Sequence, residues 1–180
     1  MTEIDNDFPA LRSVLEEYGV ALRNAYQDNL IASDRIATGE LLNSIEVRVT
    51  GPDDGTWRVI FNLAEWWKWV EDDTRPHWMP KGALLGWIAA KPVLPRPDDR
   101  GRLPTPEQLD YLIRRRIAGE SPSGLPGGTK GTHDLERAEE SLVDGWMPRI
   151  AAALQRDLSD GLHWYIVESF RELNPAPVEL

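Results

Sequence analysis

The sequence predicts a single α+β domain, residues 1–180, in which a long N-terminal helix and several further helices pack on a small, mainly antiparallel β-sheet. Apolar residues recur at three- and four-residue steps over residues 7–32 and then alternate at period two over 44–62. A length of 180 residues fits one domain with one core. Two long Gly/Pro-rich loops, 91–104 and 119–132, complete the predicted layout.

The first helix is predicted over residues 7–32, with Asp7 as its N-cap and Pro9 in its first turn. The opposite face carries charged side chains, so we expect a helix packed on a core with one solvated face. Its apolar stripe consists of Phe8, Leu11, Val14, Leu15, Tyr18, Leu22, Ala25, Tyr26 and Leu30.

A β-hairpin is predicted over residues 44–62, because two alternating runs flank the turn-rich segment GPDDG at 51–55. Side chains two residues apart lie on the same face of a strand. The face that the helices cover should therefore contain Ile45, Val47, Val49, Trp57, Val59 and Phe61.

Residues 64–90 form a tryptophan-rich segment, predicted as a short helix that stops before Pro76 and a second helix that begins near Pro80. Burying one tryptophan stabilises a fold by roughly 4–6 kcal/mol as an upper bound. We therefore expect most of the five rings to lie in the core, with Trp69 and Trp78 as the exposed pair. The five are Trp66, Trp67, Trp69, Trp78 and Trp87.

A further helix is predicted over residues 105–118, between a Pro-rich loop at 91–104 and a Gly-rich loop at 119–132. Thr105 has the sequence context of a capping box. The run Arg114–Arg116 should lie on the outer side of this helix, and the Gly-rich loop should be mobile.

The C-terminal third is predicted as helices over 133–160, followed by a strand over 163–170 that extends the sheet. Thr132 should cap the first of these helices. Gly145 and Pro148 should break or kink the helical pattern.

Composition limits the possible functions. Twenty basic and thirty acidic side chains give a net charge of −10, which disfavours nucleic-acid binding. The absence of cysteine excludes disulfides and thiolate chemistry. The acidic, amphipathic start does not resemble a secretion signal, and no apolar run approaches the ~18 residues of a membrane span, so no membrane partner is expected.

No catalytic, cofactor-binding or metal-binding residue is predicted. The strongest enzyme-like group is an acidic cluster with one histidine, which would suit a small metal-dependent hydrolase. Its spacing matches no known ligand pattern, so this function remains the alternative. The cluster comprises Glu65, Glu71, Asp72, Asp73 and His77.

A second alternative is a binding module that uses Arg114–Arg116 and Lys130 on an acidic partner or nucleic acid. The net charge of −10 favours the simpler interpretation that the arginine run is a solvated helix face.

Four motifs occur in an order that resembles the tail-component family of long-tailed bacteriophages. They are TGELLNSIEVRV at 38–49, WWKWVEDDTRPHWMPKGALLGWI at 66–88, YLIRRRIAGES at 111–121 and GGTKGTHDLERA at 127–138. The resemblance covers roughly residues 5–145. Members of this family are minor tail, neck or tail-completion proteins.

The sequence departs from the family pattern at three places. Asp73 stands where glycine usually precedes the threonine, and Asp134 with Leu135 replaces a Pro-Phe pair. The segment 163–170 has no counterpart in the family pattern.

The resemblance implies a structural, non-enzymatic virion subunit, made in the host bacterial cytoplasm and assembled as a ring between head connector and tail. Expected partners are further copies of the chain in a hexamer or dodecamer, the head connector, and tail tube or tail terminator proteins. Genomic DNA would pass without sequence-specific contact, and lumenal acidic side chains would keep it from adhering. The expected interface residues are Trp69, Trp78, Arg96, Arg100, Arg102, Arg114, Arg115, Lys130 and His133.

Overall fold

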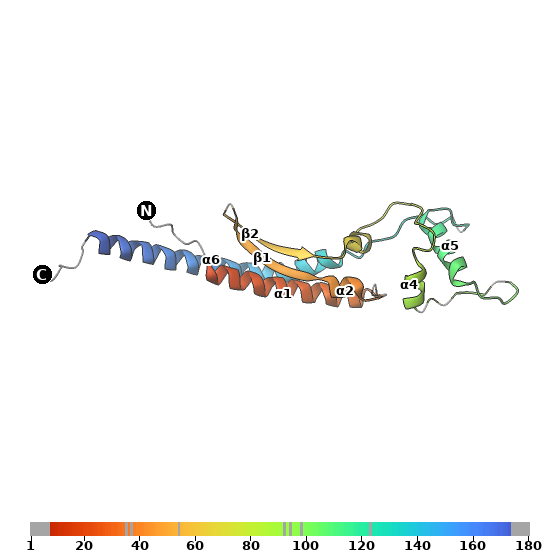
Figure 1. Cartoon of the computed structure of the whole chain (residues 1–180), viewed down its shortest axis with the longest axis horizontal. Coiled ribbons are helices and arrows are strands. Elements are labelled where there is room, and N and C mark those ends of the chain that lie inside the picture. Colours follow the sequence, from red (N-terminus) through yellow and green to blue (C-terminus); the bar gives the residue numbers. More distant parts are fainter. Residues whose placement is uncertain are drawn as a thin grey trace. The chain divides into compact units, whose positions relative to one another are not determined.

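A computed structural model shows helices together with one two-stranded antiparallel sheet, which confirms the predicted α+β class (Figure 1). It describes residues 8–34, 36, 38–53, 55–91, 93, 95–97, 99–122 and 124–173. The predicted N-cap Asp7 lies outside these residues. The elements are α1 (Pro9–Ala32), α2 (Glu40–Ser44), β1 (Glu46–Asp53), β2 (Thr56–Asn62), η1 (Glu65–Trp67), α3 (Lys68–Glu71), α4 (Leu85–Ala90), α5 (Pro106–Ile117) and α6 (Asp134–Leu173).

The chain divides into two compact units. The hairpin unit contains α1 up to Ala25, β1, β2 up to Phe61, and α6 from Ala138 onward. The junction unit contains Tyr26–Ile45 and Asn62–Arg137. Within the described residues, no helix is long and apolar enough to cross a membrane.

In the hairpin unit, α1 and α6 run antiparallel. The rings of Tyr18 and Trp146 lie 5.7 Å apart, and nearer the other end Asp157 accepts a hydrogen bond of 2.7 Å from the backbone amide of Leu11. The amides of the first helical turn have no partner within the helix. Asp157 therefore caps α1 from α6 and fixes the register of the two helices.

The hairpin packs on α1 through the predicted face. A Cβ atom added to Gly19 of α1 would lie 2.6 Å from Val47 and 3.2 Å from Val59, so only glycine lets the strands approach this closely. The predicted strand register is confirmed at these two valines. The prediction that the first strand includes Ser44 is wrong. Ser44 is the last residue of α2, and its hydroxyl donates a hydrogen bond to the carbonyl of Leu41.

The predicted break at Gly145 and Pro148 is wrong, because α6 is one continuous helix of 40 residues (Figure 1). A proline inside a helix removes one backbone hydrogen bond and disfavours the helix. Here the flanking residues are held against α1: Trp146 by Tyr18, and Arg149 by an ion pair of 2.6 Å with Glu17. These contacts stabilise the helix on both sides of Pro148.

The predicted strand at 163–170 is also wrong, because these residues continue α6. Leu158, Leu162, Ile166 and Phe170 keep the four-residue step of the preceding turns. This period outweighs the β-propensity of single aromatic and β-branched residues, which depends strongly on context.

Two predicted helix starts have different outcomes. The capping box at Thr105 is confirmed, since its hydroxyl accepts from the amide of Gln108 and the Gln108 side chain accepts in return from the amide of Thr105. The second tryptophan-segment helix begins at Leu85 rather than near Pro80. Residues 81–84 form turns instead, with Gly82 at φ 81°.

Candidate functional site

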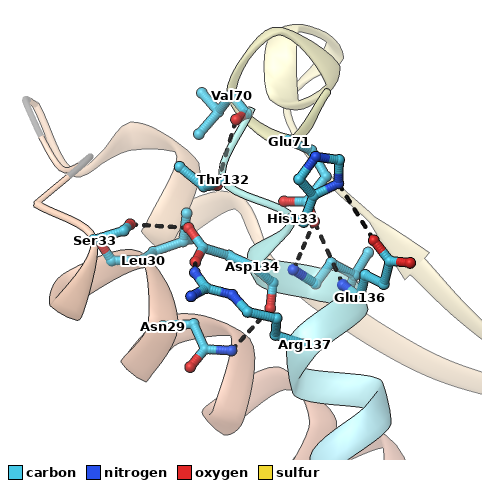
Figure 2. A network of polar contacts seen from close by, with 11 residues as sticks. Asn29, Leu30, Ser33, Val70, Glu71, Thr132, His133, Asp134, Glu136 and Arg137 are labelled. Carbon is cyan, nitrogen blue, oxygen red and sulfur yellow. Dashed lines mark hydrogen bonds and ion pairs between the residues drawn. The ribbon is translucent and has the colours of Figure 1, made fainter. Parts of the chain in front are cut away.

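A network of polar contacts lies in the junction unit, at the N-terminal end of α6 (Figure 2). Glu71, the last residue of α3, accepts hydrogen bonds through Oε1 from the amides of Leu135 at 2.7 Å and Glu136 at 3.4 Å. A carboxylate is favoured here because the first amides of a helix are unpaired and carry partial positive charge. The helix is thus capped from 64 residues upstream rather than by Thr132, whose hydroxyl bonds the carbonyl of Val70.

Asp134, the first residue of α6, is fully buried and joins that helix to the C-terminal turns of α1 (Figure 2). Its Oδ2 accepts from the hydroxyl of Ser33 at 2.9 Å, and its Oδ1 pairs with Arg137. The side-chain amide of Asn29 donates to the Asp134 carbonyl at 2.9 Å. Hydrogen bonds to both the side chain and the backbone fix this residue.

Tyr26 and Glu71 place two buried polar atoms at the same cluster. Within the described part of the chain, the Tyr26 hydroxyl and Glu71 Oε2 have no hydrogen-bond partner. Burial raises the pKa of Glu71; the amides of Leu135 and Glu136 oppose this shift, and the nearby Asp134 carboxylate adds to it. Burial, followed by the charges of Glu71 and Asp134, also raises the pKa of Tyr26. The cluster thus disfavours negative charge at both groups.

The second half of the Gly-rich loop is bound to the segment that follows α3. The amide of Thr74 donates to the carbonyl of Thr129 at 2.8 Å, and the two threonine hydroxyls lie 2.8 Å apart. The amide of Gly131 donates to Asp73 at 2.8 Å. A Cβ atom on Gly131 would lie 2.1 Å from the Glu71 carbonyl oxygen, so glycine permits this contact. Two motifs that carry the family resemblance therefore meet in space.

A second buried carboxylate, Asp110 of α5, organises another part of the junction unit. It pairs with Arg114 at 2.8 Å and accepts from the amides of Gly82 and Leu84, each at 3.1 Å. Burial would raise the pKa of Asp110, but the hydrogen bonds from Arg114 and the two amides lower it below its usual value. Arg114 is buried, so its predicted place on the outer face of the helix is wrong.

Trp69 and Trp78 are exposed, as predicted, at 62% and 45% of their surface. The prediction that most of the five rings lie in the core is wrong, because Trp66 and Trp87 are exposed as well. The Trp78 indole nitrogen donates to Glu120 at 2.9 Å. The Trp78 ring stacks on the ring of Tyr111, with centroids 6.2 Å apart. The guanidinium carbon of Arg114, also in α5, lies 5.7 Å from the Trp78 ring centroid.

The remaining predicted interface residues lie at the surface of loops and helix ends. Arg115 is half-buried and donates to the carbonyl of Glu120 at 2.8 Å. His133 is exposed in a left-handed backbone conformation, φ 51°, with its ring 3.3 Å from Glu136. The exposed basic side chains of the two long loops are Arg96, Arg100, Arg102 and Lys130.

The residues considered for a metal site have other contacts. Glu71 caps α6, Asp73 accepts from Gly131, and the His77 ring lies 2.8 Å from the carbonyl of Arg75. In the parts of the chain that the structure describes, no three His, Cys, Asp or Glu side chains are grouped to hold a metal ion.

Sequence reasoning missed an exposed apolar face on the C-terminal half of α6, because it assigned part of that segment to a strand. We call this face the α6 apolar surface, and the side chains that form it are 38–64% exposed. The four-residue spacing of the leucines is the signal that predicts it. Its residues are Leu154, Leu158, Leu162, Tyr165, Ile166 and Phe170, and Trp164 and Val167 are exposed on the other side of the same segment.

Comparison with known proteins gives no relative: no family model, curated protein or solved structure matches this chain.

Proposed function

We propose that this chain is a structural, non-enzymatic virion protein of a tailed bacteriophage. It acts as a neck or tail-completion subunit that joins the head connector to the tail. The ordered motifs at 38–49, 66–88, 111–121 and 127–138 support the proposal, because together they resemble the phage tail-component family. Thr74 belongs to the motif at 66–88 and Thr129 to the motif at 127–138. The hydrogen bonds between these two threonines join the two motifs into one structural unit.

The observation that carries the proposal is the amount of large apolar surface that a single chain leaves exposed. Trp69 and Trp78 are exposed in the junction unit, and ten large apolar side chains are exposed along the described part of α6 in the hairpin unit. Exposed apolar patches beyond a few hundred Å² mark interaction sites, and tryptophan is enriched among residues that dominate interfaces. These surfaces suit a subunit that is covered by neighbours in an assembly.

The proposed partners follow from this role. Copies of the chain form a hexameric or dodecameric ring, with head connector proteins on one side and tail tube or terminator proteins on the other. A net charge of −10 is compatible with DNA passing through the ring, since acidic side chains repel phosphate.

The proposal is tested by removing the gene from the phage that carries it and examining particles by electron microscopy. We expect filled heads and free tails that do not join, with joining restored when the gene is supplied in trans. Cryo-electron microscopy of complemented particles should show the chain as a symmetric ring at the neck. Infectious particles of normal form that lack the chain would contradict the proposal.

A further inference from the structure

Basic side chains are concentrated in one contiguous part of the junction unit. Residues 75–130 contain ten basic and five acidic side chains, a net charge of +5, whereas the rest of the chain contains ten basic and twenty-five acidic ones, a net charge of −15. The antiparallel bridge between Thr74 and Thr129 joins the two ends of this part, which we call the basic lobe. A charge asymmetry of this size indicates a surface for an acidic partner.

The outer face of α5, in the basic lobe, presents apolar and basic side chains together. At 100° per residue, the four residues that α5 contributes to this face fall within about 140° of the helix circumference. The opposite side of α5, around Asp110 and Arg114, is buried. Trp78 stacks on Tyr111 and enlarges the outer face, and the two rings and Leu112 are 45–50% exposed. We call this face the α5 surface, and its residues are Trp78, Tyr111, Leu112, Arg115 and Arg116.

Hydrogen bonds within the basic lobe hold the side chains of the α5 surface in place. The Trp78 indole nitrogen donates to the Glu120 carboxylate at 2.9 Å, and Arg115 donates to the Glu120 carbonyl at 2.8 Å. Arg116 donates to the carbonyl of Pro126. The surface is therefore ordered before a partner binds, which reduces the entropy lost on association. Tryptophan, tyrosine and arginine are also the residues that contribute most often to binding energy at interfaces.

A face of α6 in the hairpin unit has the opposite charge. Residues 138–148 contain three acidic residues and no lysine or arginine. The other side of this stretch packs inward, since Ala138 is buried and the Trp146 ring contacts α1. Four exposed residues at three- and four-residue steps share the outer side. We call this side the α6 acidic surface, and its residues are Glu140, Val143, Asp144 and Met147.

The two surfaces are complementary in polarity and in charge. The aromatic rings of the α5 surface match the apolar pair Val143 and Met147, and its two guanidinium groups match the carboxylates of Glu140 and Asp144. Nucleic acid is a poorer occupant, because the charge of −15 outside the basic lobe repels phosphate. The chain itself thus supplies the acidic partner for its basic lobe.

We infer that the α5 surface of one copy packs on the α6 acidic surface of a second copy of this chain. The inference rests on the proposed function, because it names the contact by which copies of the chain join. The two surfaces are different, so the contact is head-to-tail. Contacts of this kind generate a ring when the rotation between neighbours closes, and each copy then uses both surfaces once.

The test is self-association of the full chain, measured by analytical ultracentrifugation over a concentration series. Glu140→Lys with Asp144→Lys places like charges opposite the arginines and should weaken association by about 10-fold or more. Tyr111→Glu with Leu112→Glu should weaken it similarly from the other surface. Circular dichroism verifies that both double variants are folded.

A charge-matched control separates the contact from net charge. Glu16→Lys with Glu46→Lys makes the same change in net charge at exposed positions of α1 and β1, and should not weaken association. Wild-type association provides a measurement that needs no variant. It should weaken as salt is raised from about 0.1 M to 1 M, because the screening length falls from about 10 Å to 3 Å.

Mixing the two double variants tests the head-to-tail direction. The variant at Glu140 and Asp144 keeps its α5 surface, and the variant at Tyr111 and Leu112 keeps its α6 acidic surface. A mixture should therefore form 1:1 dimers with the wild-type dissociation constant, and these dimers should grow no further. A contact between two identical surfaces would not give this result.

The remaining outcomes separate the inference from the proposed function. A wild-type chain that is monomeric at about 0.1 mM, or association that neither double variant nor salt weakens, would overturn the inference. The neck role would remain, since it is tested by particles that lack the gene. Head-to-tail association together with normal particles that lack the chain would overturn the proposed function alone. Duplex DNA binding that only Tyr111→Glu with Leu112→Glu abolishes, with self-association unchanged, would overturn the second copy as occupant.

Discussion

Asp110 and Glu71 both bind backbone amides of a distant segment, in two regions of the junction unit, but the charges around them differ. Each is a buried carboxylate that accepts hydrogen bonds from backbone amides of a distant segment: residues 82 and 84 for Asp110, residues 135 and 136 for Glu71. Asp110 also has Arg114 as a cationic partner, and its pKa is lowered. Glu71 has no such partner among the described residues and lies near Asp134, and its pKa is raised.

The comparison teaches that amide donors alone do not determine the sign of a pKa shift. Burial disfavours the charged form of both groups, and both accept hydrogen bonds from backbone amides. The Arg114 guanidinium decides the outcome at Asp110. At Glu71 the amide hydrogen bonds lower the pKa by less than burial and the neighbouring Asp134 carboxylate raise it. The two regions should therefore respond oppositely to acid.

The largest expected effect is at Asp110. Asp110→Ala leaves the buried Arg114 guanidinium without its carboxylate and the amides of Gly82 and Leu84 without an acceptor. Breaking a buried pair from one side is strongly destabilising, and we expect a fall in Tm on the order of 10 °C. Thermal unfolding followed by circular dichroism measures it. Asp144→Ala, at an exposed position of α6, is the control and should leave Tm unchanged. A similar Tm for both variants would refute the structural role of the pair.

A matched pair of glycine substitutions compares the two regions further. In the Glu71 region, Gly131→Ala forces a Cβ atom to 2.1 Å from a backbone oxygen, and overpacking of this kind costs about 1–3 kcal/mol. In the Asp110 region, a Cβ atom on Gly82 would meet its nearest atom only at 3.5 Å. The cost of Gly82→Ala therefore comes from the positive φ of 81°, which alanine disfavours. That cost is about 1–2 kcal/mol. Urea unfolding should rank Gly131→Ala as the more destabilising change, and the reverse order would contradict the close approach.

Features encoded within one element could be predicted from the sequence. The stripe of α1, the register of the hairpin at Val47 and Val59, and the capping box of Thr105 depend on residues near each other in the chain. The error at 163–170 arose from weighing residue type above spacing. A long helix with Pro148 inside it depends on contacts with α1 that no local pattern contains.

The junction unit could not be predicted because its bonds join residues far apart. Glu71 was recognised only as part of an acidic run, since nothing near it in the sequence shows that α6 begins beside it. Arginine is rarely buried without a partner, and in the structure Asp110 is the partner that allows Arg114 to be buried. A carboxylate four residues before an arginine on one helix was the available signal.

The stability contributions of Glu71 and Asp110 should depend on pH in opposite directions. Because the folded-state pKa of Glu71 is raised, its contribution to stability is fully present below the unfolded-state value, 4.5, and is lost as pH rises through the folded-state pKa. Asp110 behaves oppositely: its contribution is present above its unfolded-state value, 3.8, and is lost as pH falls through its lowered pKa.

Glu71→Gln isolates the first of these contributions. The glutamine oxygen can still accept from Leu135, and its NH₂ group fills the position of Oε2 without charge. At neutral pH we expect the free energy of unfolding to rise by about 1 kcal/mol, and the gain to shrink as pH falls toward 4.5. Urea unfolding at several pH values measures it. A gain that is the same at every pH would show that Glu71 does not titrate with folding.

The smallest expected effect is at Tyr26, whose buried hydroxyl has no partner among the described residues. On folding, the Tyr26 hydroxyl loses its hydrogen bonds to water and gains none from the described residues. Tyr26→Phe removes this hydroxyl and keeps the packing of the ring. The free energy of unfolding should stay equal or rise by under about 1 kcal/mol. Because Asn29 does bond the carbonyl of Asp134, Asn29→Ala in the same helix should instead destabilise the chain. A loss of more than about 1 kcal/mol in Tyr26→Phe would mean that the hydroxyl has a hydrogen-bond partner in solution, with Glu71 Oε2 as the nearest candidate by its charge effect on Tyr26.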